Sequence, residues 1–419
     1  MASNGRRRVV ITGFGAITGL GDDAPSLWDG LKNGRSALGP ITAFPLSDEW
    51  LTQIAGEVSP DWDPAKRIPA GDHKRMDRYS LLGVYAAMEA AEHCGIDFHA
   101  GDPYRRGVVF GSGIGGIITI EMGHLKLINK GPKRLSPFNV PKLMANAGAG
   151  NISLALDLKG VNSSPATACA SGGHAIAEGF QFIQRGNADV MVCGGGEAAV
   201  STLCIGSFSA MKALSTRNDE PTKASRPFDR DRDGFVLSEG AAALVLEEES
   251  HAKARGAEIF GEVLGFGITG DAHHIAAPDP VGTGARVAME HALADAGLAT
   301  TDIDYINAHG TSTPLGDAAE VAAVKELFGD HAKSLAMSST KSMTGHALGA
   351  AGGIESVAVV NAIREGVLPP TINLDNPDEG FDLDFVANEA QERPVRYALN
   401  NSFGFGGHNV SLVFARYED

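Results

Sequence analysis

A cysteine set among small residues is the strongest candidate for a reactive group in this chain. Cys169 follows Pro165 and precedes Ala-Ser-Gly-Gly, and an apolar pattern typical of a helix continues over 175–185. The spacing predicts that the thiol lies in the first turn of a helix. Free backbone N–H groups and the helix dipole favour the thiolate there, so we expect the pKa of Cys169 to fall from about 8.5 to roughly 3.5–7.5. A structural cysteine at a tight helix crossing is the alternative.

Three polar segments of the second half carry groups that could act with this thiol. They are Asn307-Ala-His309-Gly-Thr311-Ser-Thr313, Ser339-Thr-Lys341-Ser-Met-Thr-Gly-His346 and Asn400-Asn-Ser-Phe403-Gly-Phe405-Gly-Gly. Each lies where a predicted strand ends or a helix begins, which is where open α/β sheets bind ligands. A cysteine with two imidazoles indicates a thioester-forming nucleophile and hydrogen-bond donors for an oxyanion. Zinc held by Cys-His-His is an alternative, although no spacing here resembles a structural zinc site.

The elements that must position these groups occur twice along the chain. The segments 171–186 and 351–366 align without a gap, and each is a predicted helix that opens with Gly-Gly. Strand patterns at 106–111 and 240–247 are likewise repeated from 303 and from 407. Two such copies predict two mostly parallel sheets covered by helices, with the Gly-Gly helices packed together at the centre. This symmetry would place His346 near Cys169. Chance similarity of two small-residue helices is the alternative.

Composition narrows the classes of partner and the cellular setting. The chain has 419 residues, 43% of them apolar and 21% charged, which is typical of globular proteins. A net charge of -16 argues against a nucleic-acid partner. We find no signal-peptide pattern and no apolar run long enough for a bilayer, so we expect no membrane association. The cysteines, none in a CxxC pair, favour a reduced, cytoplasmic setting: Cys94, Cys169, Cys193 and Cys204.

The motifs together resemble those of the β-ketoacyl-acyl-carrier-protein synthases of the thiolase superfamily, over essentially the whole chain. Four signatures carry the resemblance: Thr167-Ala-Cys169-Ala-Ser-Gly, Asn307-Ala-His309-Gly-Thr-Ser-Thr, Lys341-Ser-Met-Thr-Gly-His346 and Asn401-Ser-Phe-Gly-Phe-Gly-Gly. The elongating synthase II branch looks most similar. The resemblance implies an α/β thiolase-like fold in which two pseudo-symmetric βαβαβαββ halves form a layered αβαβα arrangement. Residues 1–255 and 256–419 would be the two halves.

The resemblance also implies an acyltransferase that performs a decarboxylating Claisen condensation. Cys169 would take an acyl group from acyl carrier protein, and malonyl carried by the same protein would lose carbon dioxide and extend the chain by two carbons. His309 and His346 would donate hydrogen bonds to the forming enolate, while Lys341 supports His346. The backbone N–H groups of Cys169 and Phe405 would form an oxyanion hole. No cofactor is required, and the enzyme would be a homodimer.

Further residues acquire expected roles from the same resemblance. Thr311 and Thr313 would bind the phosphopantetheine arm, and Phe403 and Phe405 would form a mobile gate. The acyl pocket would include Ile114 and Phe208, although Cys204 and Asn139 depart from the family pattern and leave the preferred chain length open. A monovalent cation could lie near four residues, Asn307, Glu355, Asn400 and Asn401. A basic dock for the acidic carrier protein would comprise Lys74, Arg75, Lys133, Arg134 and Lys212, with ordinary surface charge as the alternative.

Several other enzyme and non-enzyme classes compete with this interpretation. A thiolase would use a second cysteine near the C-terminus, and none follows Cys204. Ketoacyl synthase III would have asparagine in place of one histidine. A ketosynthase of a type II polyketide pathway has the same Cys-His-His set, and the lack of a second domain favours a discrete fatty-acid enzyme over it. A non-catalytic chain-length factor would lack the nucleophile, and a thioesterase would hydrolyse acyl carrier protein without using malonyl groups.

Overall fold

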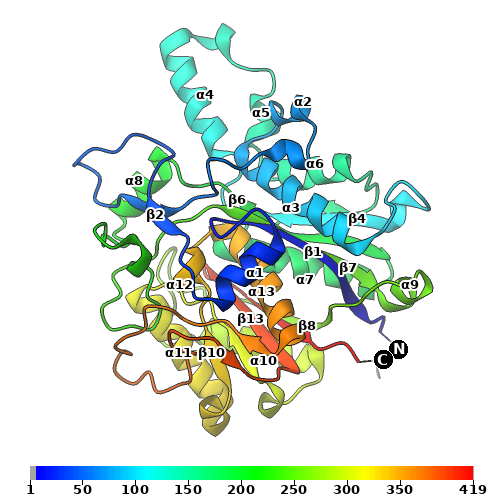
Figure 1. The fold of residues 1–419 in the computed structure, drawn as a ribbon, viewed down its shortest axis with the longest axis vertical. Coiled ribbons are helices and arrows are strands. Elements are labelled where there is room, and N and C mark those ends of the chain that lie inside the picture. Colours follow the sequence, from blue (N-terminus) through cyan, green and yellow to red (C-terminus); the bar gives the residue numbers. More distant parts are fainter. Residues whose placement is uncertain (1–5, 419) are drawn as a thin grey trace.

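The computed structural model describes residues 6–418, and its centre is one continuous sheet of ten strands (Figure 1). The order across the sheet is β10-β9-β13-β14-β8-β1-β7-β6-β4-β5. In chain order the strands are β1 (Val9–Ile17), β4 (Arg106–Gly111), β5 (Asn162–Ser163), β6 (Val190–Glu197), β7 (Gly240–Glu248), β8 (Gly261–Gly270), β9 (Tyr305–Asn307), β10 (Ala336–Ser338), β13 (Tyr397–Gly404) and β14 (His408–Ala415). Two small sheets pair β2 (Leu38–Pro40) with β3 (Ile54–Gly56), and β11 (Val367–Leu368) with β12 (Gln391–Glu392).

The sheet consists of two sets of five strands with the same pairing pattern. In one set β4 is parallel to both β5 and β6, and in the other β9 is parallel to both β10 and β13. The remaining pairs, β6-β7 and β7-β1 in the first set and β13-β14 and β14-β8 in the second, are antiparallel. The expectation of mostly parallel sheets was therefore wrong, because the closing strand of each copy, β7 or β14, runs antiparallel to both of its neighbours. The sets are also not separate sheets, since β1 pairs with β8 at three positions from Val9 to Ile11.

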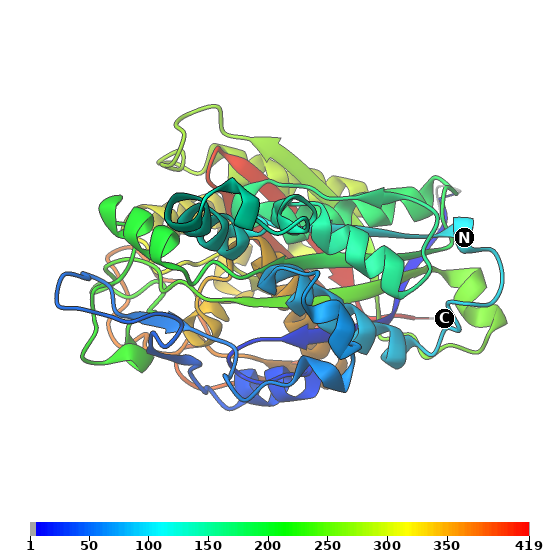
Figure 2. The ribbon, with the colours of Figure 1, turned by 90° about the horizontal axis from the view of Figure 1, so that it is seen from above.

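Helices lie on both sides of the strands, as the view from above shows (Figure 2). α3 contacts β1, β6 and β7, and α10 contacts β8 and β14, whereas α7 and α13 contact strands of both sets. Among the described residues, no helix combines the length and apolar character needed to cross a membrane. The helices are α1 (Ala24–Lys32), α2 (Ala70–His73), α3 (Arg78–Cys94), α4 (Ile117–Lys130), α5 (Asn139–Leu143), α6 (Ala147–Ala155), α7 (Ser171–Gln184), α8 (Thr202–Ala210), α9 (Glu249–Ala254), α10 (Thr283–Ala296), α11 (Pro314–Phe328), α12 (Lys341–Thr344) and α13 (Ala351–Glu365).

The two Gly-Gly helices, α7 and α13, cross at backbone distance, which confirms the packing predicted from the repeat. A Cβ atom at Gly172 would lie 2.9 Å from the Gly349 carbonyl oxygen and from the Gly353 nitrogen. A Cβ atom at Gly352 would lie 2.7 Å from the Gly173 nitrogen. Only glycine permits this contact, because side-chain carbons need more room than these distances leave.

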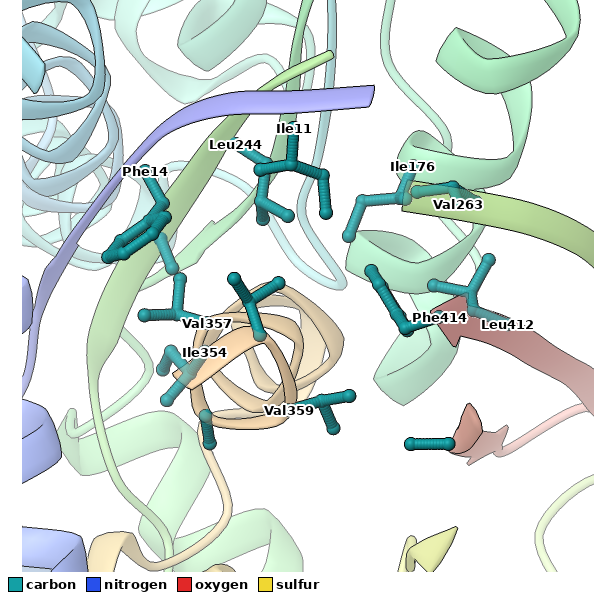
Figure 3. Close-up of a cluster of buried hydrophobic side chains, with 14 of the residues drawn as sticks. Ile11, Phe14, Ile176, Leu244, Val263, Ile354, Val357, Val359, Leu412 and Phe414 are labelled. Atoms are coloured by element: carbon teal, nitrogen blue, oxygen red, sulfur yellow. The ribbon is translucent and has the colours of Figure 1, made fainter. Parts of the chain in front are cut away.

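Branched apolar side chains fill the space around α13. Figure 3 shows Ile354, Val357 and Val359 of this helix among side chains from β1, β7, β8 and β14. All belong to one buried cluster that takes residues from both halves of the chain. The central helices are therefore held by the main core as well as by their glycine contact.

The glycine crossing predicts a stability difference between two helical Gly→Ala variants. Gly352→Ala should destabilise the protein by about 1–3 kcal/mol, because the new methyl group overlaps the α7 backbone. Gly150→Ala in α6 is the matched control, since nothing lies within 4 Å of its Cβ position. That control should be neutral or stabilising by up to about 1 kcal/mol. Urea unfolding followed by circular dichroism measures both, and equal stability of the two variants would contradict the crossing.

Candidate functional site

Cys169 lies in a short 3-10 turn, η4 (Ala168–Ala170), directly before α7. The sequence predicted that Cys169 lies in the first turn of this helix, whereas in the structure it lies one short turn before α7. Ala168 has a φ of 50°, a left-handed conformation that costs energy for a residue with a side chain. The cysteine side chain is buried, at 6% exposure. The fold thus holds the thiol at a strained turn beside the α7–α13 crossing.

His346 reaches the thiol from the equivalent place in the second half. Its Nε2 atom lies 2.9 Å from Cys169 Sγ, and it precedes the turn η8 (Leu348–Ala350) that leads into α13. His309, which follows β9, also lies close to the thiol. One side-chain nitrogen or sulfur atom from each of Cys169, His309 and His346 lies within 4.8 Å of the other two. The two imidazole rings are 5.4 Å apart in an edge-to-face arrangement. The pseudo-symmetry predicted from the sequence therefore does bring His346 to Cys169.

A buried ion pair lies behind the two histidines. Lys341 donates a short hydrogen bond from Nζ to Glu355 Oε1, and both side chains are almost fully buried. Glu355 comes from α13, so this pair joins the loop that carries His346 to the central helix. Burial raises the pKa of Glu355 to about 7, against the opposing effect of Lys341. Lys341 places a positive charge behind the two histidines, and Glu355 balances it.

The protonation of the site differs from the sequence-based expectation. Burial raises the pKa of Cys169 to about 12, although Lys341 and the Phe405 N–H group act in the opposite direction. The expected low thiol pKa was therefore wrong, because loss of water outweighs the stabilising groups at the helix end. Burial, followed by the charge of Lys341, holds the pKa values of His309 and His346 well below 6.5. At neutral pH the thiol is protonated and both imidazoles are neutral.

The glycine-rich turn after β13 covers the other side of the sulfur. The backbone N–H groups of Phe405 and of Cys169 itself point to Cys169 Sγ and lower its pKa. Phe403 contacts the His309 ring edge to face, with 5.8 Å between centroids. The Phe405 ring lies 6.4 Å from that of Phe208. Backbone donors and aromatic rings from one turn therefore meet at the thiol.

A cavity of about 460 Å³ leads to Cys169. Thr311 and Thr313 line it, with 3.0 Å between their hydroxyl oxygens. Its other lining residues include both histidines, Phe403, Phe405 and the exposed Lys212. Ile114 and Phe208 are not part of this lining and instead pack with Cys169 in an apolar cluster. The thiol therefore lies between a cavity with hydroxyl groups and a packed apolar region.

Buried oxygens without hydrogen-bond partners mark a candidate cation site. Among the described residues, Asn307 Oδ1, Asn400 Oδ1 and Glu355 Oε2 have no donor. Asn307 and Asn400 are register partners in β9 and β13, and Asn400 Nδ2 bonds to Gly352 O and Ser356 Oγ of α13, beside Glu355. Three oxygen acceptors fit a monovalent cation. Asn401 fits less well, because its Oδ1 already accepts a hydrogen bond from Ser411 at 2.8 Å.

Zinc binding at Cys169, His309 and His346 is not supported by a complete set of ligands. Among the described residues, no fourth His, Cys, Asp or Glu joins these three, and a structural zinc site uses four ligands.

The basic residues expected to dock a partner are all exposed. Lys74 and Arg75 follow α2, and Arg75 stacks over the ring of Phe138 at 6.0 Å while pairing with Asp72 at 3.5 Å. Lys133 and Arg134 lie in the turn η3 (Pro132–Arg134) after α4. Phe138 follows Lys133 and Arg134 in the chain, so its contact with Arg75 brings the two basic pairs near each other. Lys212 lies apart from both pairs and lines the cavity.

Two buried carboxylates of the site were missed from the sequence. Glu320 of α11 accepts the backbone N–H groups of His309 and Gly310 at 2.9 and 2.8 Å. Glu197, at the end of β6, accepts N–H groups of Gly113 and Gly349 at 2.7 and 3.1 Å and so joins loops of both halves. Burial raises both pKa values to about 7. A charged residue ending the apolar run Val190–Glu197 was the signal available in the sequence.

Comparisons with known proteins agree over the whole chain. The model of the beta-ketoacyl synthase N-terminal domain matches residues 6–252, and that of the C-terminal domain matches 260–375. The 3-oxoacyl-(acyl-carrier-protein) synthase 2 of Coxiella burnetii is 50% identical, covering 99% of this chain and 100% of the relative. The Synechocystis protein of the same name is 48% identical over 100% of both chains. A solved type II polyketide ketosynthase, in complex with its acyl-carrier protein, has a TM-score of 0.91 at 31% identity and covers 99% of this chain and 100% of its own.

The raised thiol pKa predicts a specific pH dependence for Cys169. Because the folded protein disfavours the thiolate, alkylation of Cys169 by iodoacetamide should keep accelerating as the pH rises beyond 9, above the ordinary cysteine pKa of about 8.5. Peptide mass spectrometry follows Cys169 separately from the other three cysteines. A free cysteine peptide is the reference. A rate that levels off below pH 7 would show that the helix end and Lys341 outweigh burial.

Proposed function

Because this chain belongs to the β-ketoacyl synthase family, we propose that Cys169, His309 and His346 carry out its condensing reaction. The chain is an acyltransferase of the 3-oxoacyl-acyl-carrier-protein synthase 2 type, which condenses malonyl and acyl groups held on acyl carrier protein and lengthens the acyl chain by two carbons. The observation that supports this choice of residues is the 2.9 Å contact between Cys169 Sγ and His346 Nε2, with His309 beside it at the end of a cavity.

The first step is transfer of the acyl group to Cys169. The sulfur attacks the thioester carbonyl, and its proton passes to the neutral His346 Nε2 as the S–C bond forms. The proton then goes to the departing phosphopantetheine sulfur. The N–H groups of Cys169 and Phe405 stabilise the negative oxygen of the tetrahedral intermediate. A thiol that stays protonated at rest is compatible with this step, since its proton acceptor is already in contact.

The second step is decarboxylation of malonyl and formation of the new C–C bond. Loss of carbon dioxide leaves an enolate, whose oxygen accepts hydrogen bonds from the N–H groups of His309 and His346; for this step His346 takes the Nε2–H tautomer, after exchanging the Nδ1 proton that it carried during acyl transfer. Their low pKa values keep them neutral, so they stabilise the enolate without protonating its carbon. The carbon attacks the acyl carbonyl on Cys169, and collapse of the intermediate expels the cysteine as a thiolate, which takes up one proton from solvent to restore the resting thiol. The product is a β-ketoacyl chain on the carrier protein.

Lys341 and Glu355 are proposed as positioning residues. Their buried ion pair sets the electrostatic potential at both histidines. A monovalent cation bound by Asn307, Asn400 and Glu355 would hold these same side chains in place. The cation would supply structural charge only, and Asn401 would contribute through Ser411 instead of as a ligand. An identical melting temperature in potassium, sodium and tetramethylammonium chloride would contradict a bound cation.

The two sides of Cys169 suit the two parts of the substrate. Thr311 and Thr313 present hydroxyl groups to the cavity, where they would hydrogen-bond the amide groups of the phosphopantetheine arm. Ile114 and Phe208 belong to the apolar cluster around Cys169, which suits an alkyl chain. Phe403 and Phe405, flanked by glycines, would move as the gate between the two regions.

The proposed dimer rests on exposed apolar side chains of α4 and its surroundings. Figure 1 shows α4 standing out from the body of the fold, and Met122, Leu125 and Ile128 on this helix are 53–68% exposed. A second copy of the chain would cover them. Sedimentation as a monomer at micromolar concentration would contradict this proposal.

We also propose a cytoplasmic location, because Cys169 must remain a free thiol, as the four cysteines are here.

Acyl transfer and elongation can be separated by mass spectrometry of the protein. Incubation with C8 to C16 acyl carrier protein should add an acyl mass to Cys169, and malonyl carrier protein should then release a β-keto product two carbons longer. Cys169→Ala should show no adduct. His309→Ala should still be acylated but should condense roughly 10²–10³-fold more slowly, because the enolate loses a donor.

Each competing function predicts a different result in that experiment. Free fatty acid without extension would indicate a thioesterase, and a wild-type protein that takes no acyl group on Cys169 would indicate a non-catalytic partner. Equal loss of acylation and condensation in His309→Ala would contradict the assignment of His309 to the enolate.

Docking of the carrier protein predicts an electrostatic effect on KM. Replacing Lys74 and Arg75 together by glutamate should raise KM for acyl carrier protein about tenfold or more at low salt and leave kcat nearly unchanged. The charge-matched control replaces Lys325 on α11 and Lys333 in the turn directly after it together by glutamate, which reverses two cations as well, and Figure 1 shows α11 at the opposite end from α2. An equal change in KM for both variants would show that net charge, and not this surface, controls binding.

A further inference from the structure

The apolar cluster beside Cys169 takes side chains from two helices, α4 and α8, and from the loops around them. Ile117 and Ile118 come from the start of α4, while Cys204 and Phe208 come from α8. Cys169 and Cys204 are each only 6% exposed, and Ile205 is fully buried, so the cluster is closely packed. An alkyl chain can enter such a closely packed region only if side chains of the cluster, or the elements that carry them, move apart.

One carboxylate on α4 holds the beginning of α8 in place. Glu121 Oε1 accepts hydrogen bonds from the Ser201 hydroxyl at 2.5 Å and from the Leu203 N–H group at 2.8 Å. Its Oε2 accepts the Thr202 hydroxyl at 3.0 Å. Ser201 is the N-cap of α8 and accepts the N–H group of Cys204 at 3.3 Å. The carboxylate thus satisfies donors at the positive end of α8, which strengthens the contact.

A second contact limits α8 from a different segment. The Trp50 ring lies 3.8 Å from the position that a Cβ atom at Gly206 would take. Trp50 itself stacks on Phe44 with 5.1 Å between centroids, and the loop that carries them is closed by the hydrogen bond from Ile41 N to Gln53 O. The middle of α8 is therefore supported by this loop, whereas its beginning depends on Glu121.

We propose that Glu121 is a specificity-determining residue, which limits the length of the acyl chain by fixing the separation of α4 and α8. It acts through these helices and touches no reacting atom, so it is a positioning residue. The proposal rests on the proposed function, because the cluster must hold the acyl chain carried by Cys169. Loss of the carboxylate releases the beginning of α8, lets Cys204 move away from Ile117 and lengthens the pocket.

The experiment compares acyl-chain profiles of purified full-length variants with C8 and C16 acyl carrier protein. Glu121→Ala should raise the ratio of kcat/KM for C16 to that for C8 by about tenfold or more, because apolar pockets discriminate chain length by about this factor per methylene. KM for malonyl carrier protein should not change. Glu121→Gln should keep the wild-type ratio, since its amide oxygen still accepts from Ser201 and Leu203. Ser201→Ala, which removes one of the links, should shift the ratio in the same direction by a smaller factor.

Asp23→Ala is the matched control for loss of a helix cap. Asp23 caps α1 through the Ser26 N–H group and belongs to no part of the apolar cluster. This variant should leave the chain-length ratio unchanged. An unchanged ratio in Glu121→Ala, an equal loss at both lengths or a shift toward C8 would overturn the proposal. Failure of the wild-type protein to elongate any acyl group would instead overturn the proposed function.

Discussion

The crossing of α7 and α13 at backbone distance is the contact on which the active site depends. Each helix is preceded by a short turn, η4 or η8, and the crossing brings these turns together at the centre of the molecule. Cys169 lies in one turn and His346 precedes the other, so the separation of the helices sets the 2.9 Å contact between them. Larger side chains at the crossing would separate the helices and with them the two reacting groups.

Burial at this crossing determines the chemistry as much as residue type does. A thiol and two imidazoles without water are favoured in their neutral forms, and the positive charge of the site is supplied by Lys341 instead. Glu355 balances that charge, and hydrogen bonds from the backbone orient the remaining groups. Neutral imidazoles suit a reaction whose main demand is stabilisation of an enolate, and an adjacent proton acceptor suits a nucleophile that is protonated at rest.

The surroundings of Cys169 separate two tasks in space. On one side is a cavity with threonine hydroxyls, and on the other are α4 and α8 with their packed apolar side chains. Phe403 contacts His309 and Phe405 contacts Phe208, so this glycine-rich segment lies where the two regions meet. Glu121 adds a polar contact at the far end of the apolar wall. In the proposed function, selection of the acyl chain and binding of its carrier would therefore depend on different elements of the same fold.

Local patterns in the sequence determined the elements and the reactive groups. The Gly-Gly openings marked the two central helices. The motifs around Cys169, His309 and His346 identified the chemistry, because residue type and spacing are sequence properties. Tertiary structure alone decided the pairing of β1 with β8, the direction of the Cys169 pKa shift, the partners of Glu197 and Glu320, and the unpaired oxygens around Glu355. These properties depend on burial and on contacts between residues far apart in the chain, which periodicity and spacing do not encode.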